Sequence, residues 1–334
     1  MDTITISYIS KFQYCNARKA SLINMESINP KLDLFYKYRT ISVVHLKKLQ
    51  EDIDKLRNSG KLSDNKVYRS YIDTKKFEIP ESIPNAKSII VIAVFGKMGL
   101  VNFNLDGKKY EAMVPPNYYD DGLEIEDLEN IIVKNIIIEP GYKIEYTRKL
   151  HLKLLAVRSG LGKYGRNNIC YVDKMGSLLS LYTFFTDFQF EEDNWSEIRM
   201  MDQCENCTIC IKNCPTRAIP VPNDENFVIN VSKCIPVYNE IKGIIPDWIP
   251  SDAHNALMGC MKCQLPCPAN HDAIKITERF EDISERETKM ILDGKIDKKM
   301  VNSLSKKLKM FSPSNADYML PVIKRNLQFL LNQN

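Results

Sequence analysis

The chain has 334 residues and a formal net charge of +4, with 44% hydrophobic and 26% charged residues. This length fits two or three packed units with a sizeable core. The longest apolar stretch, residues 88–95, is too short to span a bilayer, so we expect a cytoplasmic protein with no membrane attachment. The mild positive charge permits an anionic partner but does not require one.

Strands and helices are expected to alternate in the first half of the chain. Residues 42–62 have helical periodicity and end near Gly60, in the manner of a helix C-cap. The β-branched run at residues 88–95 follows two prolines and predicts a buried strand. Residues 123–138 predict a second helix, which ends at a Pro-Gly pair. This order indicates an α/β or α+β domain.

A glycine segment follows these elements. Residues 160–165 read GLGKYG and satisfy the dinucleotide fingerprint, with Asp187 about twenty residues further on. A dinucleotide turn must follow a strand and open a helix. Here residues 149–159 are helix-like and residues 168–185 are strand-like around a Gly-Ser turn, so the pattern argues against nicotinamide binding.

Eight of the ten cysteines form two groups that each end in Cys-Pro. The groups are Cys204, Cys207, Cys210 and Cys214, and then Cys234, Cys260, Cys263 and Cys267. The first spacing is that of bacterial two-cluster ferredoxins, in which the fourth cysteine of a run binds the other cluster. The pattern therefore implies one [4Fe-4S] cluster on Cys204, Cys207, Cys210 and Cys267, and another on Cys214, Cys234, Cys260 and Cys263.

Zinc binding and disulfide bonding are the alternative uses of these cysteines. Paired C-x2-C motifs also bind zinc, but two sets of four thiolates, each set closed by Cys-Pro, favour paired cubes. The N-terminus has no secretory signal pattern, which argues against a disulfide framework. Cys15 and Cys170 are expected to be free thiols.

The cysteine groups divide the chain into three expected parts. Residues 1–190 form the α/β domain, residues 191–275 a ferredoxin-like double [4Fe-4S] domain, and residues 276–334 a helical extension. Residues 295–309 and 322–331 are the helices expected in this extension. We expect them to pack on the core, with a docking surface as the alternative.

One longer stretch carries a family resemblance. The segment LAVRSGLGKYGRNN begins at Leu155 and is followed by a Gly176-Ser177 turn, by Thr186-Asp187 and then by the cysteine groups. In residues and order it resembles epoxyqueuosine reductases and, more distantly, reductive dehalogenases. The resemblance covers most of the chain, is closest from Leu155 to the last cysteine, and indicates a divergent paralogue.

The resemblance implies a base-off cobamide (cobalamin) between the first two domains, reduced by the nearer cluster to cob(I)alamin. By this similarity the corrinoid pocket would involve Arg158, Gly160, Gly162, Asn167, Leu181 and Ile235. The alternative for Gly162 and Gly165 is that they only turn a helix into a strand. Asp252-Ala253-His254 begins a D-x-H-x-x-G corrinoid signature that fails at Leu257, which agrees with a cobamide bound without a protein imidazole.

The chain departs from the family at the expected proton donor. Epoxyqueuosine reductases carry an aspartate there, whereas this chain has Tyr146, Thr147 and Arg148. Tyr146 is a candidate catalytic acid because a neighbouring cation lowers a phenol's pKa, and reductive dehalogenases use a tyrosine beside a basic residue. A buried structural tyrosine is the alternative.

The sequence leaves three hypotheses for function. The favoured one is a cobamide-dependent iron-sulfur reductase of a small organic substrate, fed by a low-potential donor of the ferredoxin or flavodoxin type. The second is an electron-transfer protein that reactivates a corrinoid protein. The third is epoxyqueuosine reductase acting on tRNA, which is disfavoured because family members continue into tRNA-gripping repeats whereas this sequence stops at Asn334.

Overall fold

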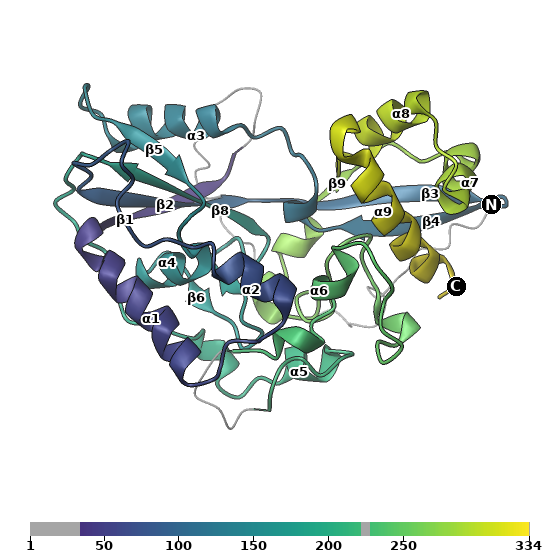
Figure 1. The fold of residues 1–334 in the computed structure, drawn as a ribbon, viewed down its shortest axis with the longest axis horizontal. Helices are drawn as coiled ribbons and strands as arrows, with labels where there is room; N and C mark the ends of the chain where they lie inside the picture. The colour runs from purple at the N-terminus through teal and green to yellow at the C-terminus, as the bar shows by residue number, and fades with distance from the viewer. Residues whose placement is uncertain (1–33, 222–227, 334) are drawn as a thin grey trace, which may run out of the picture.

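The computed structural model describes residues 34–221 and 228–333 and shows a mixed α/β architecture (Figure 1). The strands are β1 Tyr36–Ser42, β2 Ser88–Phe95, β3 Met98–Leu105, β4 Lys108–Val114, β5 Ile144–Thr147, β6 Lys163–Tyr164, β7 Cys170–Tyr171, β8 Leu179–Thr186 and β9 Thr277–Arg279. The helices are α1 Leu46–Asn58, α2 Lys66–Ile72, α3 Ile125–Ile131, α4 Leu152–Arg158, α5 Ile209–Asn213, α6 Pro236–Asn239, α7 Glu285–Asp293, α8 Lys298–Leu308 and α9 Ala316–Leu331. Within these residues no helix is both long and apolar enough to cross a bilayer.

The central sheet has the order β1-β2-β8-β5, and every pair in it is antiparallel. Helix α3 covers one face, and α1 and α4 cover the other (Figure 1). Strand β2 enters two cores because alternate side chains point to opposite faces: Ile89 and Val91 pack with α1 and α4, and Ile90 and Ile92 with α3. The predicted buried strand is confirmed.

The predicted helices are also confirmed, with shifted ends. Helix α1 ends just before Gly60, whose φ of +68° is the left-handed conformation of a helix C-cap. The helix predicted over 123–138 is α3, extended by a π-helical turn at Ile132–Ile136. The GLGKYG segment follows helix α4 and leads into strand β6, so the strand-turn-helix context of a dinucleotide site is not met.

A buried ion pair joins α4 to α1. The Arg158 guanidinium donates to both carboxylate oxygens of Asp52, at 2.8 and 2.9 Å. It also donates to Glu197 at 3.2 Å and lies 5.1 Å from the ring centre of Trp195. Both Arg158 and Asp52 are less than 10% exposed, so each charge depends on the other for solvation.

Breaking this pair is expected to destabilise the fold strongly. Asp52→Asn or Arg158→Ala leaves one buried charge without its partner, which lowers the free energy of unfolding by about 3–5 kcal/mol. The matched control is Lys48→Ala, which breaks the exposed α1 pair with Glu51 and costs at most about 1 kcal/mol. Chemical denaturation measures both; equal small losses would contradict the structural role of Arg158.

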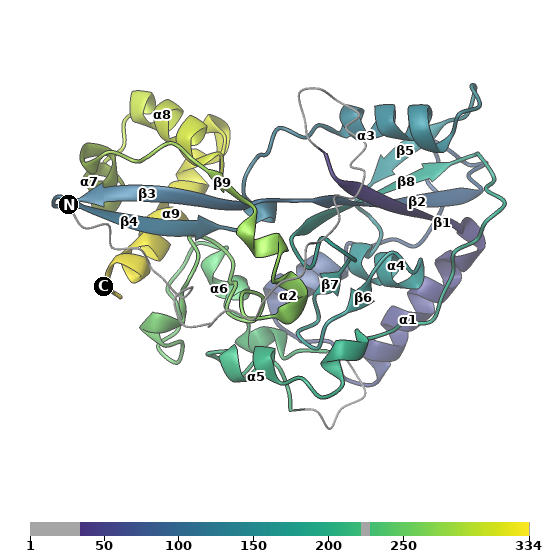
Figure 2. The ribbon, with the colours of Figure 1, turned by 180° about the vertical axis from the view of Figure 1, so that it is seen from behind.

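Residues 276–334, the expected helical extension, share their core with an earlier part of the chain. Strands β3 and β4 form a hairpin whose Asp106-Gly107 turn has positive φ at both positions. Strand β9 pairs with β3, and helices α7, α8 and α9 pack on the hairpin (Figure 2). Residues 98–114, expected in the first domain, therefore share a core with the C-terminal helices. The expected packing of these helices against the rest of the chain is confirmed.

A carboxylate inside this C-terminal unit predicts a pH dependence of stability. Glu287 accepts hydrogen bonds from the backbone N–H and hydroxyl of Ser284, from the Ser303 hydroxyl, and from Lys307 at 3.0 Å. Burial raises its pKa, but these bonds outweigh burial and lower the pKa from 4.5 to about 2.

A depressed folded pKa stabilises the protein above the unfolded pKa, and the stabilisation is lost as pH falls toward the folded value. We therefore expect the protein to exceed its Glu287→Gln variant in stability at pH 7, and the difference to shrink between about pH 5 and pH 2. Urea midpoints of the two proteins at matched pH measure this difference. A gap that does not change with pH would contradict the assignment.

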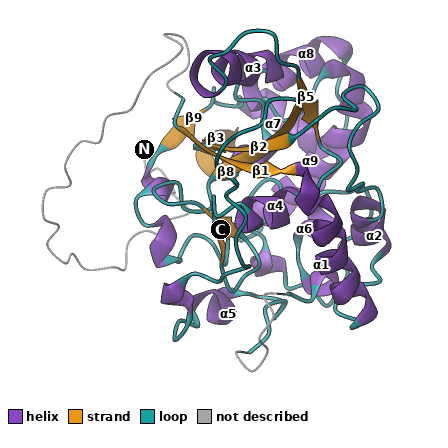
Figure 3. Cartoon of the chain, turned by 90° about the vertical axis from the view of Figure 1, so that its left-hand side faces the viewer, coloured by secondary structure: helices purple, strands orange, loops and turns teal. Residues whose placement is uncertain are grey.

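The segment between β8 and β9 carries the cysteine groups. It consists of loops and short helices, including α5 and α6, and lies beside the sheets (Figure 3). Regular structure is sparse here because the backbone must curl so that several cysteines of one loop face a common point.

Candidate functional site

Three cysteines of the first group and one of the second line one small cavity. Cys204, Cys207 and Cys210 face it from the loop around α5, and Cys267 reaches it from the second group. Burial, and then the nearby Cys204, Cys207 and Cys267 thiolates, raise the pKa of Cys210 to about 11. Four mutually repelling thiolates at one place are suited to a bound cationic cluster.

The second group shows the same mutual influence. Burial, followed by the charges of Cys260 and Cys214, raises the pKa of Cys234 to about 12. Burial, followed by Cys260 and Cys234, raises the pKa of Cys263 well above its usual value. Cys234 and Cys263 are thus both influenced by the charge of Cys260, as expected of neighbouring ligands.

The small cavity thus joins Cys267 of the second run to three cysteines of the first run, and the two ligand sets inferred from the spacing stay a prediction. In residues 34–221 and 228–333 no three Cys, His, Asp or Glu side chains converge on a single metal ion. A [4Fe-4S] cube does not require such a point, because its four thiolates bind four different irons. Cys170, expected to be free, is a buried free thiol, and Cys15 lies outside the described residues.

Tyr146 lies half-buried on β5 at the edge of the central sheet. Its hydroxyl oxygen accepts a hydrogen bond of 2.6 Å from Arg148 Nε. Its ring contacts Tyr182 and Phe184 of β8, with ring centres 6.3 and 5.4 Å apart. The predicted neighbourhood of a phenol and a cation is therefore present.

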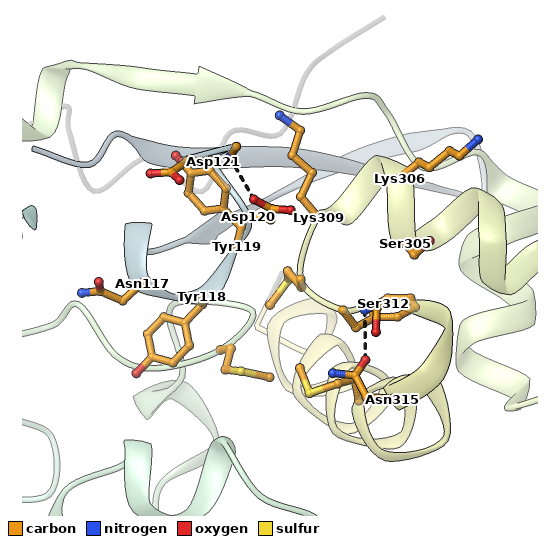
Figure 4. A pocket seen from close by; sticks show the side chains of 15 residues that line it. Asn117, Tyr118, Tyr119, Asp120, Asp121, Ser305, Lys306, Lys309, Ser312 and Asn315 are labelled. Carbon is orange, nitrogen blue, oxygen red and sulfur yellow. Dashed lines mark hydrogen bonds between the residues drawn. The ribbon is translucent and has the colours of Figure 1, made fainter. Parts of the chain in front are cut away.

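A large cavity lies between the loop after β4 and the C-terminal helices (Figure 4). It has a volume of about 860 Å³. One side is formed by residues 117–122 and the other by α8, the start of α9 and the turn between them. Lys309, Asp120 and Asp121 contribute charge, and Met310 and Met319 contribute apolar surface.

The cavity adjoins the second cysteine group, since Met258, two residues before Cys260, lines it. Tyr118, which lines it, donates a hydrogen bond to Glu240, and its pKa is raised by burial, Glu240, Cys234 and Cys260. On the other side, burial and then the charge of Asp121 raise the pKa of Tyr182. No sequence motif marked Tyr118, Asp121 or Tyr182, because only the fold brings these segments together.

The residues expected to bind a corrinoid come from several different elements. Arg158 is used in the ion pair with Asp52. Gly160 has φ +68° at the end of α4. A Cβ on Gly162 would lie 2.7 Å from Cys170 Sγ and 2.8 Å from the Tyr171 carbonyl oxygen, so this glycine allows the turn between α4 and β6 to pack closely on β7.

The remaining three lie in different places. Leu181 packs on the core beneath α4, and Ile235 is buried in a separate cluster with Ile245. Asn167 lies in the cavity of the first cysteine group. Corrinoid binding by these residues stays a prediction.

His254 is buried and stacked on Phe329, with ring centres 4.4 Å apart. Neither ring nitrogen has a hydrogen-bond partner within the described part of the chain. Burial, and then Arg325 and Lys262, lower its pKa to about 4. The imidazole is therefore neutral at physiological pH and packs as a flat ring near Ile235 and Cys260.

Comparison with known proteins defines the class first. A family model described as a 4Fe-4S double cluster binding domain matches residues 203–270, which span all eight cysteines. The chain is thus an iron-sulfur protein with a double [4Fe-4S] cluster domain.

The relatives are more specific. Epoxyqueuosine reductase from Staphylococcus aureus is 31% identical over 196 residues, which are 57% of this chain and 50% of that protein. The enzyme from Aliivibrio fischeri is 37% identical over 128 residues, 38% of this chain and 32% of that protein. The protein described here is therefore epoxyqueuosine reductase-like in sequence, although the matches span half or less of these relatives.

Solved structures show that the fold is shared. Epoxyqueuosine reductase from Streptococcus thermophilus has a TM-score of 0.59 at 17% identity, covering 88% of this chain and 76% of that chain. The Bacillus subtilis enzyme gives a TM-score of 0.59 at 21% identity, covering 88% and 77%. The expected mixed α/β fold with a double-cluster domain and a helical C-terminal region is confirmed.

Proposed function

We propose that this protein is an iron-sulfur oxidoreductase of the epoxyqueuosine reductase type that acts on a modified nucleoside in tRNA. The observation that carries the proposal is the pair of four-cysteine groups in a chain with extended similarity to epoxyqueuosine reductases. A structure of one relative contains a tRNA-Tyr stem loop modified with epoxyqueuosine. The comparisons thus favour the third hypothesis over the small-molecule reductase preferred from the sequence.

The surface around Tyr146 supports an RNA substrate. Tyr71 is 55% exposed, and Lys75 Nζ lies 4.2 Å from the centre of its ring. Lys75 also donates a hydrogen bond to the backbone carbonyl of Arg148, whose side chain holds Tyr146. Exposed aromatic rings beside cations are suited to stacked bases and to phosphates.

The residues of this chain have separable roles in the proposal. The eight cysteines would hold the two clusters, which would supply electrons received from a low-potential donor of the ferredoxin or flavodoxin type. Removal of the epoxide oxygen as water takes two electrons and two protons. Tyr146 supplies one proton and solvent the other, and Arg148 stabilises the phenolate that remains. A cobamide would supply the reactive low-valent metal when bound, as the resemblance implies.

The proposal is tested with anaerobically reconstituted protein, cobalamin, a low-potential reductant and tRNA carrying epoxyqueuosine. Nucleoside analysis by mass spectrometry should show the substrate mass replaced by that of the deoxygenated product, and binding of the tRNA should weaken as salt rises. If the clusters are intact and base-off cobalamin is retained but the tRNA is unaltered, the result would support the small-molecule reductase instead. Intact clusters without retained corrinoid would favour the electron-transfer protein.

A further inference from the structure

The hairpin of β6 and β7 inserts its connecting residues between the two cysteine groups. Arg166 donates hydrogen bonds to the backbone carbonyls of Cys204 and Cys207 and to that of Glu205. It therefore holds the loop of the first group. The side chain of the next residue, Asn167, instead contacts Cys263 of the second group.

Asn167 is 3% exposed, and all of its amide atoms have partners. Its oxygen accepts a hydrogen bond from the backbone N–H of Ile169 at 3.3 Å, which fixes the amide so that the NH2 group points away from that backbone. The NH2 group donates to Cys263 Sγ at 3.6 Å and to the Tyr171 hydroxyl at 2.9 Å.

Tyr171 completes the bridge to the first group. It is 4% exposed and lines the same small cavity as Cys267. Since its oxygen accepts from Asn167, its own proton is free to be donated to the Cys267 sulfur. Gly165 allows this contact, because a Cβ there would lie 2.6 Å from Asn167 Oδ1 and 2.5 Å from the Tyr171 ring.

We propose that Asn167 and Tyr171 are positioning residues that set the reduction potentials of the two clusters, each donating a hydrogen bond to a ligand sulfur of a different cluster. This inference rests on the double-cluster domain and is independent of the substrate. A cluster gains negative charge on reduction, so a donor to its thiolate stabilises the reduced state more than the oxidised state and raises the potential. The Asn167–Tyr171 hydrogen bond places the two donors in one fixed unit.

Removing each donor should lower the potential of its own cluster. Tyr171→Phe keeps the ring and removes only the hydroxyl, so the cluster of Cys267 should shift to a more negative midpoint while that of Cys263 stays in place. Asn167→Leu should shift the cluster of Cys263, with a smaller shift at the other cluster because Tyr171 loses its donor. The matched control is Tyr164→Phe, a buried tyrosine of the same hairpin in the core beneath α4.

The measurement is a potentiometric titration followed by EPR on the reconstituted full chain, without RNA or cobamide. The iron content of each variant is measured as well. If Asn167→Leu loses iron, the midpoint potential of the Cys267 cluster in Tyr171→Phe tests the proposal by itself. Wild-type midpoints in Tyr171→Phe at full iron content would overturn the proposal, as would equal shifts in the Tyr164→Phe control. Since no substrate is present, failure here is distinguishable from failure to reduce tRNA.

Discussion

Replacing Cys207 by Ala is expected to remove the first cluster and roughly four of about eight bound irons. The three remaining thiolates leave the fourth iron without a protein ligand. Iron analysis and the visible absorbance of anaerobically reconstituted protein measure the loss. Cys260→Ala should cause an equal loss at the second cluster, and the double variant should lose both.

The control for these changes is Cys170→Ala. Cys170 is buried and belongs to neither group, so its removal should leave the iron content unchanged. Full iron in Cys207→Ala would exclude the ligand assignment. Loss of all iron in Cys207→Ala, but not in Cys170→Ala, would indicate that the two clusters assemble only together.

Replacing Tyr146 by Phe is expected to lower turnover by about 10²–10⁴-fold, the range for loss of a general acid. The ring packing on Tyr182 and Phe184 is retained, so stability, iron content and tRNA affinity should not change. Single-turnover rates with epoxyqueuosine-containing tRNA isolate the chemical step.

The matched control is Tyr142→Phe on the same side of the sheet. Tyr142 is 41% exposed, and its hydroxyl donates only to Glu139, so turnover should be unaffected. Unreduced turnover in Tyr146→Phe would assign Tyr146 to packing. A raised KM with unaltered kcat would instead indicate that the phenol contacts the bound substrate without donating its proton.

Local patterns predicted the regular elements well. The run at residues 88–95 is apolar at every position after Ser88, as in a strand that is covered on both faces, and the structure has β2 at those residues. Gly60 marked the end of α1 because only glycine takes the left-handed cap conformation readily. The Asp106-Gly107 turn is an equally direct hairpin signal.

Positions that depend on distant partners were harder to predict. Arg158 matches a family segment, yet its guanidinium reaches Asp52, 106 residues earlier in the chain. No local sequence pattern distinguishes a basic residue that binds a cofactor from one that forms an ion pair between two helices. The sharing of one core by β3, β4 and the C-terminal helices was missed for the same reason.

By itself the sequence determined the chemistry of the cluster domain and the identity of the elements, because cysteine spacing and hydrophobic period act over a few residues. Only the tertiary structure decided which groups share a site. It placed Tyr118 beside the second cysteine group and Asn167 between the two groups. Such tertiary contacts depend on how the buried surfaces of separate elements pack together, and a local sequence pattern does not contain that information.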